Sequence, residues 1–406
     1  MESKDRPVEM RKPSLLVAAG IDFSLGCAGT QYLLDELSRW FAVEVYVLTQ
    51  PRQAAWYAGL SYPCRVYPFW GTRWTKGPLR LMSKVFRLAL FLKLLRARYV
   101  LATEATYLRE AAWAKRLRGG RQRLAQFCQE LYLPEEYPPG SPKGRWSETQ
   151  KKYARVPDVV IDVDPFRAGI RREYYRLVHM PYVLRNTFPL AQMPPAAAPG
   201  ELWRLTGIAP PSADIPVLVH AGGIGPEKPL ERVVDAVAAL KRPVFLLAFC
   251  AASESQIRRV REYAAHKLGA ERFWFRPPVP REALRARLWE ADVGVVDYAF
   301  SMEPTLNQKY CAPTKLYEFM ACGLAVLGSD NESIRGIVER EGCGVCARGD
   351  APMDLARALE ELLRQDVAAM KAQARAAFAA RYSYETCCAD EVRRIAEEML
   401  RIDHGG

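Results

Sequence analysis

The stretch from Asp292 to Asp330 constrains the fold more than any other part of the chain. It begins with a short apolar run rich in β-branched residues, Val293 to Val296, which is typical of a buried strand. A polar loop follows, and Lys315 to Cys322 is predicted as a helix. Pro313 and Thr314 stand at its start, where proline and a capping hydroxyl are favoured. A second apolar run completes a strand, loop, helix and strand, which is half of a doubly wound α/β unit.

The same stretch contains the first candidate site residues. In doubly wound units, ligands gather beyond the carboxyl ends of the strands, and anions bind at helix N-termini. Lys315 and Glu318 are three residues apart, so they share one face of the first helical turns. A cation for a phosphate beside a carboxylate for sugar hydroxyls is the pair that a nucleotide-sugar site needs.

Strands and helices alternate along the rest of the chain, which predicts parallel sheets in both halves. At 406 residues the chain is too long for one ordinary core, so two domains are expected. The further strands are expected at residues 14–20, 43–48, 99–104, 123–129, 158–163, 215–220, 243–249 and 273–276, and residues 182–186 close the first half. The run 133–147, rich in proline and glycine, is predicted as a loop or lid over the site.

The composition of a second proline-rich run sets the expected domain boundary. Residues 190–200, LAQMPPAAAPG, are predicted as the interdomain linker. The expected domains are therefore residues 1–189 and 201–382, each doubly wound and Rossmann-like, facing each other across a cleft. Residues 383–406 are predicted as a C-terminal helix that crosses back to the N-terminal domain.

Small residues follow the first expected strand. Gly26, Ala28 and Gly29 would let a ligand approach the backbone closely, and a plain tight turn is the alternative. No G-x-G-x-x-G motif is in register here, so a dinucleotide fingerprint is not present.

The net charge of +12 suits a nucleic acid, an anionic membrane surface or a polyphosphate ligand. Much of the excess lies between Arg73 and Arg123, where Glu104 and Glu110 are the acidic residues. Residues 79–98 mix apolar and basic residues at helical spacing, which resembles an interfacial helix on anionic lipid. The alternative is a helix packed on the sheet with a solvated basic face. Nucleic acid is not expected as a partner, because no base-stacking platform is evident.

Neither a membrane span nor a secretory signal is expected. No apolar run reaches the roughly 20 residues that a span requires, and the N-terminus MESKDRPVEMRKPS lacks the apolar core of a signal peptide. We expect a cytoplasmic protein that meets the inner face of the membrane peripherally.

No metal site is predicted. The ten cysteines suggest reduced thiols. Cys343, Cys346 and the Cys387-Cys388 pair lack a second C-x-x-C knuckle, so a structural zinc site is not expected. Asp162 and Asp164 form an Asp-x-Asp pair at a strand end, but capping of the following helix by Asp164 is the simpler account.

Three segments carry a resemblance to a known family. Residues 306–330, LNQKYCAPTKLYEFMACGLAVLGSD, resemble glycosyltransferase family 4, in which many members have an Asn, a Tyr-Cys pair, Pro-Asn-Lys and a Glu-Tyr-Met-Ala-x-Gly run. Residues 220–229, HAGGIGPEKP, are similar to the glycine loop and Glu-Lys-Gly motif of that family. Residues 186–189 are similar to its Asn-x-x-Pro motif. The rest of the N-terminal half resembles the family in its order of elements, and the resemblance implies the two-domain GT-B fold.

The resemblance implies a role for particular residues. Glu318 matches the glutamate that accepts hydrogen bonds from the nucleotide ribose, a role that suits a carboxylate. Lys228 matches the lysine that neutralises the donor diphosphate, and Gly222 and Gly223 would let phosphate reach backbone N–H groups. The other positions that match the donor pocket are Val279, where the backbone meets the base, and Asn307, Tyr310, Thr314 and Lys315.

The sequence also departs from the family. Residues 221–226 contain no arginine, although the family commonly has one in its glycine loop. Thr314 replaces the usual asparagine. Tyr310 stands where many members carry a second glutamate, and Glu303 is nearby but out of register. These departures leave the sugar and the donor open.

The predicted function is transfer of a sugar from a nucleoside-diphosphate sugar to an acceptor hydroxyl, in the cleft between the domains. Lys228, Lys315 and helix N-termini would stabilise the leaving diphosphate without a metal, and no cofactor is expected besides the nucleotide-sugar substrate. The N-terminal domain would hold the acceptor, which is a glycan, a lipid-linked sugar or a small molecule. Retention of configuration and a place in cell-surface glycan or glycolipid synthesis are carried over from the family.

The general base stays open among Glu130, Glu104 and His220, of which Glu130 is the candidate retained. Two other functions also stay open. A nucleotide-sugar epimerase can share this architecture, and a protein that binds nucleotide sugars without turnover would fit the weakened motif.

Overall fold

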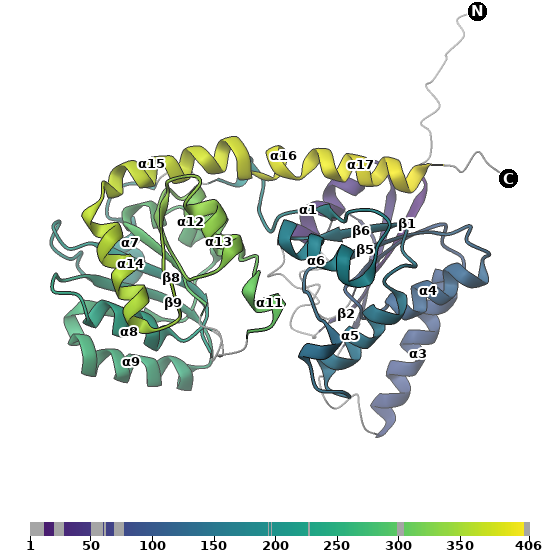
Figure 1. The fold of residues 1–406 in the computed structure, drawn as a ribbon, viewed down its shortest axis with the longest axis horizontal. Helices are drawn as coiled ribbons and strands as arrows, with labels where there is room; N and C mark the ends of the chain where they lie inside the picture. The colour runs from purple at the N-terminus through teal and green to yellow at the C-terminus, as the bar shows by residue number, and fades with distance from the viewer. Residues whose placement is uncertain are drawn as a thin grey trace, which may run out of the picture. The chain divides into compact units, whose positions relative to one another are not determined.

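The computed structural model describes residues 12–19, 28–49, 60, 62–68, 77–193, 195, 197–225, 228–298 and 304–401. The chain forms two compact units, one made of Met1–Leu184 with Ala389–Gly406 and the other of Arg185–Cys388 (Figure 1).

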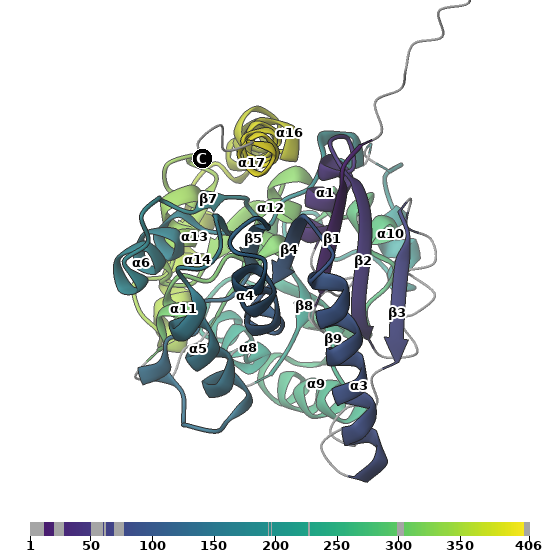
Figure 2. The ribbon, with the colours of Figure 1, turned by 90° about the vertical axis from the view of Figure 1, so that its right-hand side faces the viewer.

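Unit 1 contains a parallel sheet of seven strands in the order β3-β2-β1-β4-β5-β6-β7. Figure 2 shows β1, β2 and β3 in succession along one end of this sheet. The strands are β1 (Ser14–Ala19), β2 (Ala42–Thr49), β3 (Cys64–Pro68), β4 (Tyr99–Thr103), β5 (Arg123–Cys128), β6 (Val159–Asp162) and β7 (Tyr182–Val183). The helices are α1 (Ala28–Leu37), α3 (Gly77–Leu94), α4 (Leu108–Leu117), α5 (Pro142–Tyr153), α6 (Pro165–Tyr175) and α17 (Ala389–Leu400), with a short 3-10 helix at Pro134–Glu136.

The strands of unit 1 are continuous apolar runs because helices cover both faces of a parallel sheet. All five residues of β4 are buried. On one face, Phe86, Leu90 and Leu94 of α3 recur every four residues and pack in a core that also contains Val100 of β4. The C-terminal helix α17 packs against α1, β5, β6 and β7.

Unit 2 contains a parallel sheet of six strands in the order β10-β9-β8-β11-β12-β13. The strands are β8 (Val217–Gly223), β9 (Phe245–Ala251), β10 (Phe273–Arg276), β11 (Val293–Val296), β12 (Ala325–Gly328) and β13 (Gly344–Cys346). The helices are α7 (Glu201–Thr206), α8 (Leu230–Ala238), α9 (Glu254–Leu268), α10 (Arg281–Arg285), α11 (Leu306–Lys309), α12 (Thr314–Ala321), α13 (Glu332–Val338), α14 (Pro352–Arg364), α15 (Val367–Ala377) and α16 (Tyr384–Cys387). Single turns lie at Leu190–Gln192, Ala270–Arg272 and Leu288–Glu290, and α15 continues as a π-helical turn at Phe378–Tyr382.

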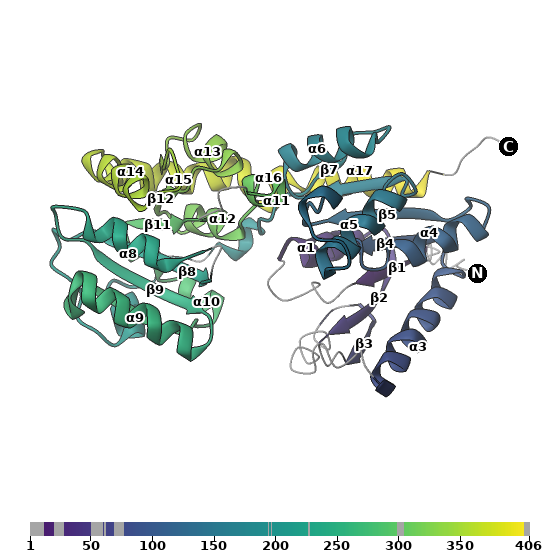
Figure 3. The same ribbon diagram turned by 60° about the horizontal axis from the view of Figure 1, so that its bottom comes forward.

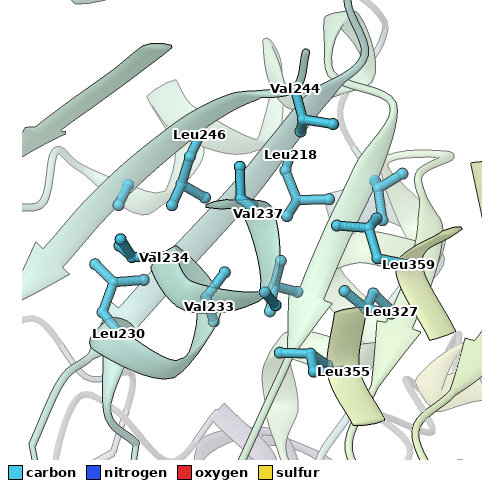
Figure 4. Close-up of a cluster of buried hydrophobic side chains, with 14 of the residues drawn as sticks. Leu218, Leu230, Val233, Val234, Val237, Val244, Leu246, Leu327, Leu355 and Leu359 are labelled. Carbon is cyan, nitrogen blue, oxygen red and sulfur yellow. The ribbon is translucent and has the colours of Figure 1, made fainter. Parts of the chain in front are cut away.

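The core of unit 2 shows how helical spacing covers this sheet. Val233 and Val237 of α8 point onto the strands beside Leu218 of β8, and Leu355 and Leu359 of α14 extend the same cluster (Figure 4). The strand order reverses between β8 and β11, which makes the carboxyl ends of these two strands the topological switch point.

The predicted domain boundary and linker were wrong. The second unit starts at Arg185, and residues 190–200 belong to it. Backbone hydrogen bonds are the reason: Leu190 N–H donates to the Glu385 carboxylate at 2.9 Å, and Ala197 N–H donates to the Ala286 carbonyl at 2.9 Å.

Several elements differ from the sequence predictions. The expected lid 133–147 instead runs into helix α5, where Ser141 Oγ accepts a hydrogen bond from Gly144 N–H and Pro142 occupies the first turn. Proline is well suited to a first helical turn, so the run was misread as loop. Helix α11, with a capping box between Thr305 and Gln308, lies in the expected polar loop. The predicted terminal helix is interrupted at Cys388.

A close contact between strand β11 and helix α12 gives a stability prediction. A Cβ atom added at Gly294 would lie 2.4 Å from Phe319 Cγ of α12. We expect Gly294→Ala to lower the free energy of unfolding by about 1–3 kcal/mol through overpacking. Urea denaturation measures the change, with Gly336→Ala on α13 as the control, because nothing lies within 4 Å of a Cβ there. Equal stability of the two variants would contradict this packing.

Candidate active site

The candidate site lies at the carboxyl edge of the unit 2 sheet. Strand β8 ends in Gly222 and Gly223, and strand β11 is followed directly by Asp297 and Tyr298. Gly222 has a φ of 134°, a backbone conformation that favours glycine. Both predicted glycines are therefore at the end of a strand, where a ligand can approach the backbone at the switch point.

Two lysines lie over one tyrosine ring at this edge. The Nζ atom of Lys228 is 4.9 Å from the centre of the Tyr298 ring, and the Nζ atom of Lys315 is 4.7 Å from it. A tight turn places Lys228, because its N–H donates to the Gly225 carbonyl at 2.9 Å. The aromatic ring attracts both ammonium groups and so holds two like charges near each other. The sequence motifs identified both lysines, but not the tyrosine between them.

The electrostatics of the site follow from this pairing. Burial, followed by the charge of Lys228, lowers the pKa of Lys315 to about 8, although Asp297 opposes the shift. Burial lowers the pKa of His220 to about 3, and the positive charges of Lys315 and Lys228 contribute to this shift. His220 is therefore neutral and a weak base at neutral pH. An anion bound here would relieve the repulsion between the lysines.

A buried ion pair places an arginine at the same edge of the sheet. Arg232 Nη1 of α8 lies 3.1 Å from Asp297 Oδ1, and both side chains are buried. Burial raises the pKa of Asp297, while Arg232 and Lys315 oppose that shift. Arg232 lies on the helix that follows the glycine loop, and its charge is paired with Asp297. An arginine among the apolar positions of the predicted helix 230–240 was the signal for it.

The Glu318 carboxylate is held by two arginines of α10. Its Oε1 atom accepts a hydrogen bond from Arg285 Nη2 at 2.6 Å and lies 3.1 Å from Arg281 Nε. The Arg285 guanidinium also stacks on Phe188, 4.2 Å from the ring centre. Both arginines contact Oε1, and among the described residues Oε2 has no hydrogen-bond partner. Neither arginine was predicted from the sequence, although their four-residue spacing puts them on one face of the helix.

The start of α12 differs from the predicted cap. Pro313 occupies the N-cap position, no side chain caps the helix, and Thr314 is its first residue. The prediction that Thr314 provides a capping hydroxyl was wrong, because Pro313 takes the cap position. First-turn N–H groups without a side-chain cap are suited to an anion. Asn186 Nδ2 donates to the Ala312 carbonyl at 2.9 Å, which fixes the loop leading into Lys315.

The remaining predicted donor residues lie in segments that follow strands β10 and β11. Asn307 is in α11 and Tyr310 directly follows that helix. Asn331 fixes this segment by donating to the Lys309 carbonyl at 2.8 Å. Val279 lies between β10 and α10, beyond the carboxyl end of β10.

In unit 1, the acidic candidates lie at strand ends. Glu130 lies shortly after β5, and its side chain is 44% exposed. Its Oε2 atom is 3.6 Å from Arg167 Nη1. Glu104 follows β4 with a φ of 57°, and its Oε1 accepts hydrogen bonds from the N–H groups of Gln129 and Glu130. Glu104 therefore orients the backbone at Glu130.

The other unit 1 predictions can be placed as follows. Gly26 lies outside the described residues, and Ala28 and Gly29 start helix α1, so the expected loop at these two positions was wrong. Asp162 pairs with Arg171 at 2.7 Å, and Asp164 caps α6 as predicted. No three His, Cys, Asp or Glu side chains of the described ranges gather in a way that could hold a metal ion.

Among the helices of the described ranges, none combines the length and apolar character needed to cross a bilayer.

Two parallel-sheet units of this order, with cations and a carboxylate at the switch point, define a GT-B architecture. Residues 209–381, which make up most of the second unit, match the family described as Glycosyl transferases group 1. A search of curated protein sequences gives no significant match.

Three solved structures illustrate the likeness over the whole chain. The Anabaena protein HepE in complex with UDP-glucose is 16% identical, with a TM-score of 0.69, covering 95% of this chain and 99% of that one. Sucrose-phosphate synthase from Thermosynechococcus elongatus is 18% identical, with a TM-score of 0.69 and coverage of 96% and 99%. WaaG, a glycosyltransferase involved in lipopolysaccharide biosynthesis, is 13% identical, with a TM-score of 0.62 and coverage of 95% and 99%. These likenesses establish the fold.

Proposed function

We propose that the protein transfers a sugar from a nucleoside-diphosphate sugar to an acceptor hydroxyl. The observation that carries this proposal is the pair of ammonium groups, Lys228 and Lys315, that share the ring of Tyr298. They lie at the uncapped start of α12, the helix that also carries Glu318. A diphosphate and an attached ribose need these groups at one edge. The complex of HepE with UDP-glucose supports a uridine nucleotide as the first donor to test.

The chemistry follows from where charge develops. The leaving diphosphate gains negative charge as the glycosidic bond breaks, and preorganised positive groups lower the barrier to that step. Lys228, Lys315, the first N–H groups of α12 and the backbone of Gly222 and Gly223 would take this role. Oε2 of Glu318 would accept hydrogen bonds from the ribose hydroxyls. This scheme uses neither a metal nor a cofactor.

The acceptor side is assigned to unit 1 by analogy with the family, with Glu130 as the candidate base. The resemblance to family 4 supports retention of configuration. The fold shared with WaaG, which is involved in lipopolysaccharide biosynthesis, favours a cell-surface glycan or a lipid-linked sugar as acceptor. A small-molecule acceptor is the alternative.

The proposal predicts a pH dependence of donor binding. A bound diphosphate raises the pKa of Lys315 above its free value of about 8, so binding takes up a proton when Lys315 is neutral. The affinity for the donor is therefore highest below the pKa of Lys315 in the ligand-free protein. It falls as the pH rises above that pKa, by up to about ten-fold per pH unit. Calorimetry across this range, in two buffers of different ionisation enthalpy, measures both the slope and the proton uptake. Lys315→Arg is the control, because arginine stays charged. The same slope in that variant would contradict the assignment.

The function is tested with a panel of nucleotide sugars. A true donor stabilises the folded state by mass action, so it raises the melting temperature. Each stabilising donor is then incubated with lipid-linked sugars, glycans and small hydroxyl compounds, and the products are analysed by mass spectrometry. A glycosylated acceptor is the expected result. Free epimerised sugar would favour an epimerase, and binding without turnover for any acceptor would favour a non-catalytic binding protein.

A further inference from the structure

Helix α3 carries an apolar stripe that faces solvent. Its buried residues Phe86 and Leu90 pack on the sheet, as described above. Val85, Leu88 and Leu92 lie on the opposite side of the helix, and their side chains are 58%, 58% and 51% exposed. Their three- and four-residue spacing makes one continuous stripe. Large apolar side chains gathered on a surface mark an interaction site rather than scattered exposure.

Helix α4 extends this stripe into a face. Trp113 and Leu117 are four residues apart on α4, and they are 50% and 71% exposed. The two helices pack side by side (Figure 3), and α4 buries Ala111 and Ala114 in the same core as α3. The exposed residues of each helix therefore lie on the side away from this shared core, and Trp113 Nε1 also donates a hydrogen bond to Tyr153 OH of α5 at 2.9 Å. We call Val85, Leu88, Leu92, Trp113 and Leu117 the α3–α4 face.

The charge around the α3–α4 face is positive. Exposed basic residues of the two helices and the turns that follow them are Lys84, Arg96, Arg98, Arg109, Arg116 and Arg121. The acidic residues between positions 77 and 121 are Glu104 and Glu110.

Glu110 offsets one of these six cations, Arg109, and the Glu104 carboxylate is turned to the backbone at the end of β5. Glu110 is buried and contacts Arg87 at 2.5 Å and Arg109 at 2.8 Å. The carboxylate of Glu104 accepts backbone hydrogen bonds at the end of β5. The face thus combines apolar side chains with excess positive charge.

We propose that the α3–α4 face docks on a bilayer that contains anionic lipid. The apolar side chains would enter the headgroup boundary, and the surrounding cations would meet lipid phosphates. Charge complementarity selects this partner, since an apolar patch alone would not require the cations. The sequence predicted membrane contact through residues 79–98 only. In the structure, one side of that helix is buried in the core. The exposed face also includes Trp113 and Leu117 of α4.

Vesicle sedimentation tests the proposal with the full-length protein. We expect binding to phosphatidylcholine vesicles with about 30% phosphatidylglycerol at low salt, and release at high salt. Leu88→Gln with Leu92→Gln removes apolar contact, and Lys84→Glu with Arg96→Glu reverses two charges. Each pair should weaken binding by at least about ten-fold. Quenching of tryptophan fluorescence by brominated lipid should fall in Trp113→Phe.

A matched control separates local docking from overall charge. Lys241→Glu with Arg258→Glu makes the same charge change at exposed positions of unit 2 and should leave binding unchanged. Donor-induced thermal stabilisation, where a donor is found, should persist in all of these variants, so failure of docking is distinct from failure of the proposed function. Equal loss of vesicle binding in the control would overturn the proposal. Binding to vesicles of phosphatidylcholine alone that is as strong as binding to anionic vesicles would also overturn it. A protein partner that occupies the α3–α4 face in place of lipid would do the same.

Discussion

Replacing Lys315 by methionine is expected to weaken donor binding by at least about ten-fold while stabilising the ligand-free protein. The ammonium group of Lys315 lies beside Lys228 over Tyr298, where the diphosphate is proposed to bind. Loss of one preorganised charge at a reacting group costs about 10²–10³ in rate, so kcat/KM should fall by that factor. The thermal shift caused by the donor should be correspondingly smaller.

The stabilising effect comes from the same electrostatics. The folded state lowers the pKa of Lys315 from 10.5 to about 8, so it disfavours the charged lysine at neutral pH. Removing that charge should raise the free energy of unfolding by about 1–3 kcal/mol at pH 7. For a lysine with a lowered pKa, stability is reduced below pH 8 and rises as pH increases from about 8 to 10.5. Urea denaturation of wild type and variant across this range checks the sign.

Lys241→Met, at an exposed position of unit 2, is the matched control and should change neither quantity. Undiminished donor affinity in Lys315→Met would contradict the diphosphate site. A variant that is less stable than the wild type at pH 7 would contradict the electrostatic account.

Substitution of Glu318 is the second prediction with a large effect. Glu318→Gln keeps the size of the side chain but removes the charge that would bind the ribose hydroxyls. Hydrogen bonds to a charged group contribute about 1.5–3 kcal/mol, so kcat/KM should fall by about 10–150-fold. Steady-state kinetics with the donor as varied substrate measures this loss.

Glu318→Ala should also reduce stability, because Arg285 would remain buried without its carboxylate partner. Removing one partner of a buried ion pair lowers the free energy of unfolding by about 3–5 kcal/mol. Because Arg285 still stacks on Phe188, we expect the loss in this variant to be near the lower value. Arg281→Gln is the control, because this more exposed partner should cost no more than about 1 kcal/mol. Unchanged kinetics in Glu318→Gln would exclude Glu318 from the donor site.

Much of the fold was predictable because both sheets are parallel and buried. Such strands are short apolar runs, and the strand predicted at 273–276 coincides with β10. Lys228, Lys315 and Glu318 were predictable because they lie in local motifs. Local signals also existed for α5, where Ser141 and Pro142 form a favourable helix start.

The parts that failed depend on contacts between distant segments. Tyr298 and Lys228 are far apart in the sequence, and so are Arg285 and Glu318. No spacing rule joins such pairs, because packing of the strands and helices brings them together. The linker prediction failed for the same reason, since hydrogen bonds to Glu385 and Ala286 fix the proline-rich run to unit 2.

The most direct test of the donor site is calorimetric titration of the intact protein with UDP-, GDP-, ADP- and dTDP-linked sugars. We predict that one of these donors binds at a single site, and that Lys228→Met and Lys315→Met each weaken its binding at pH 7 by at least about ten-fold. Absence of heat with every donor, or full affinity after both lysines are replaced, would contradict a diphosphate site between Lys228 and Lys315.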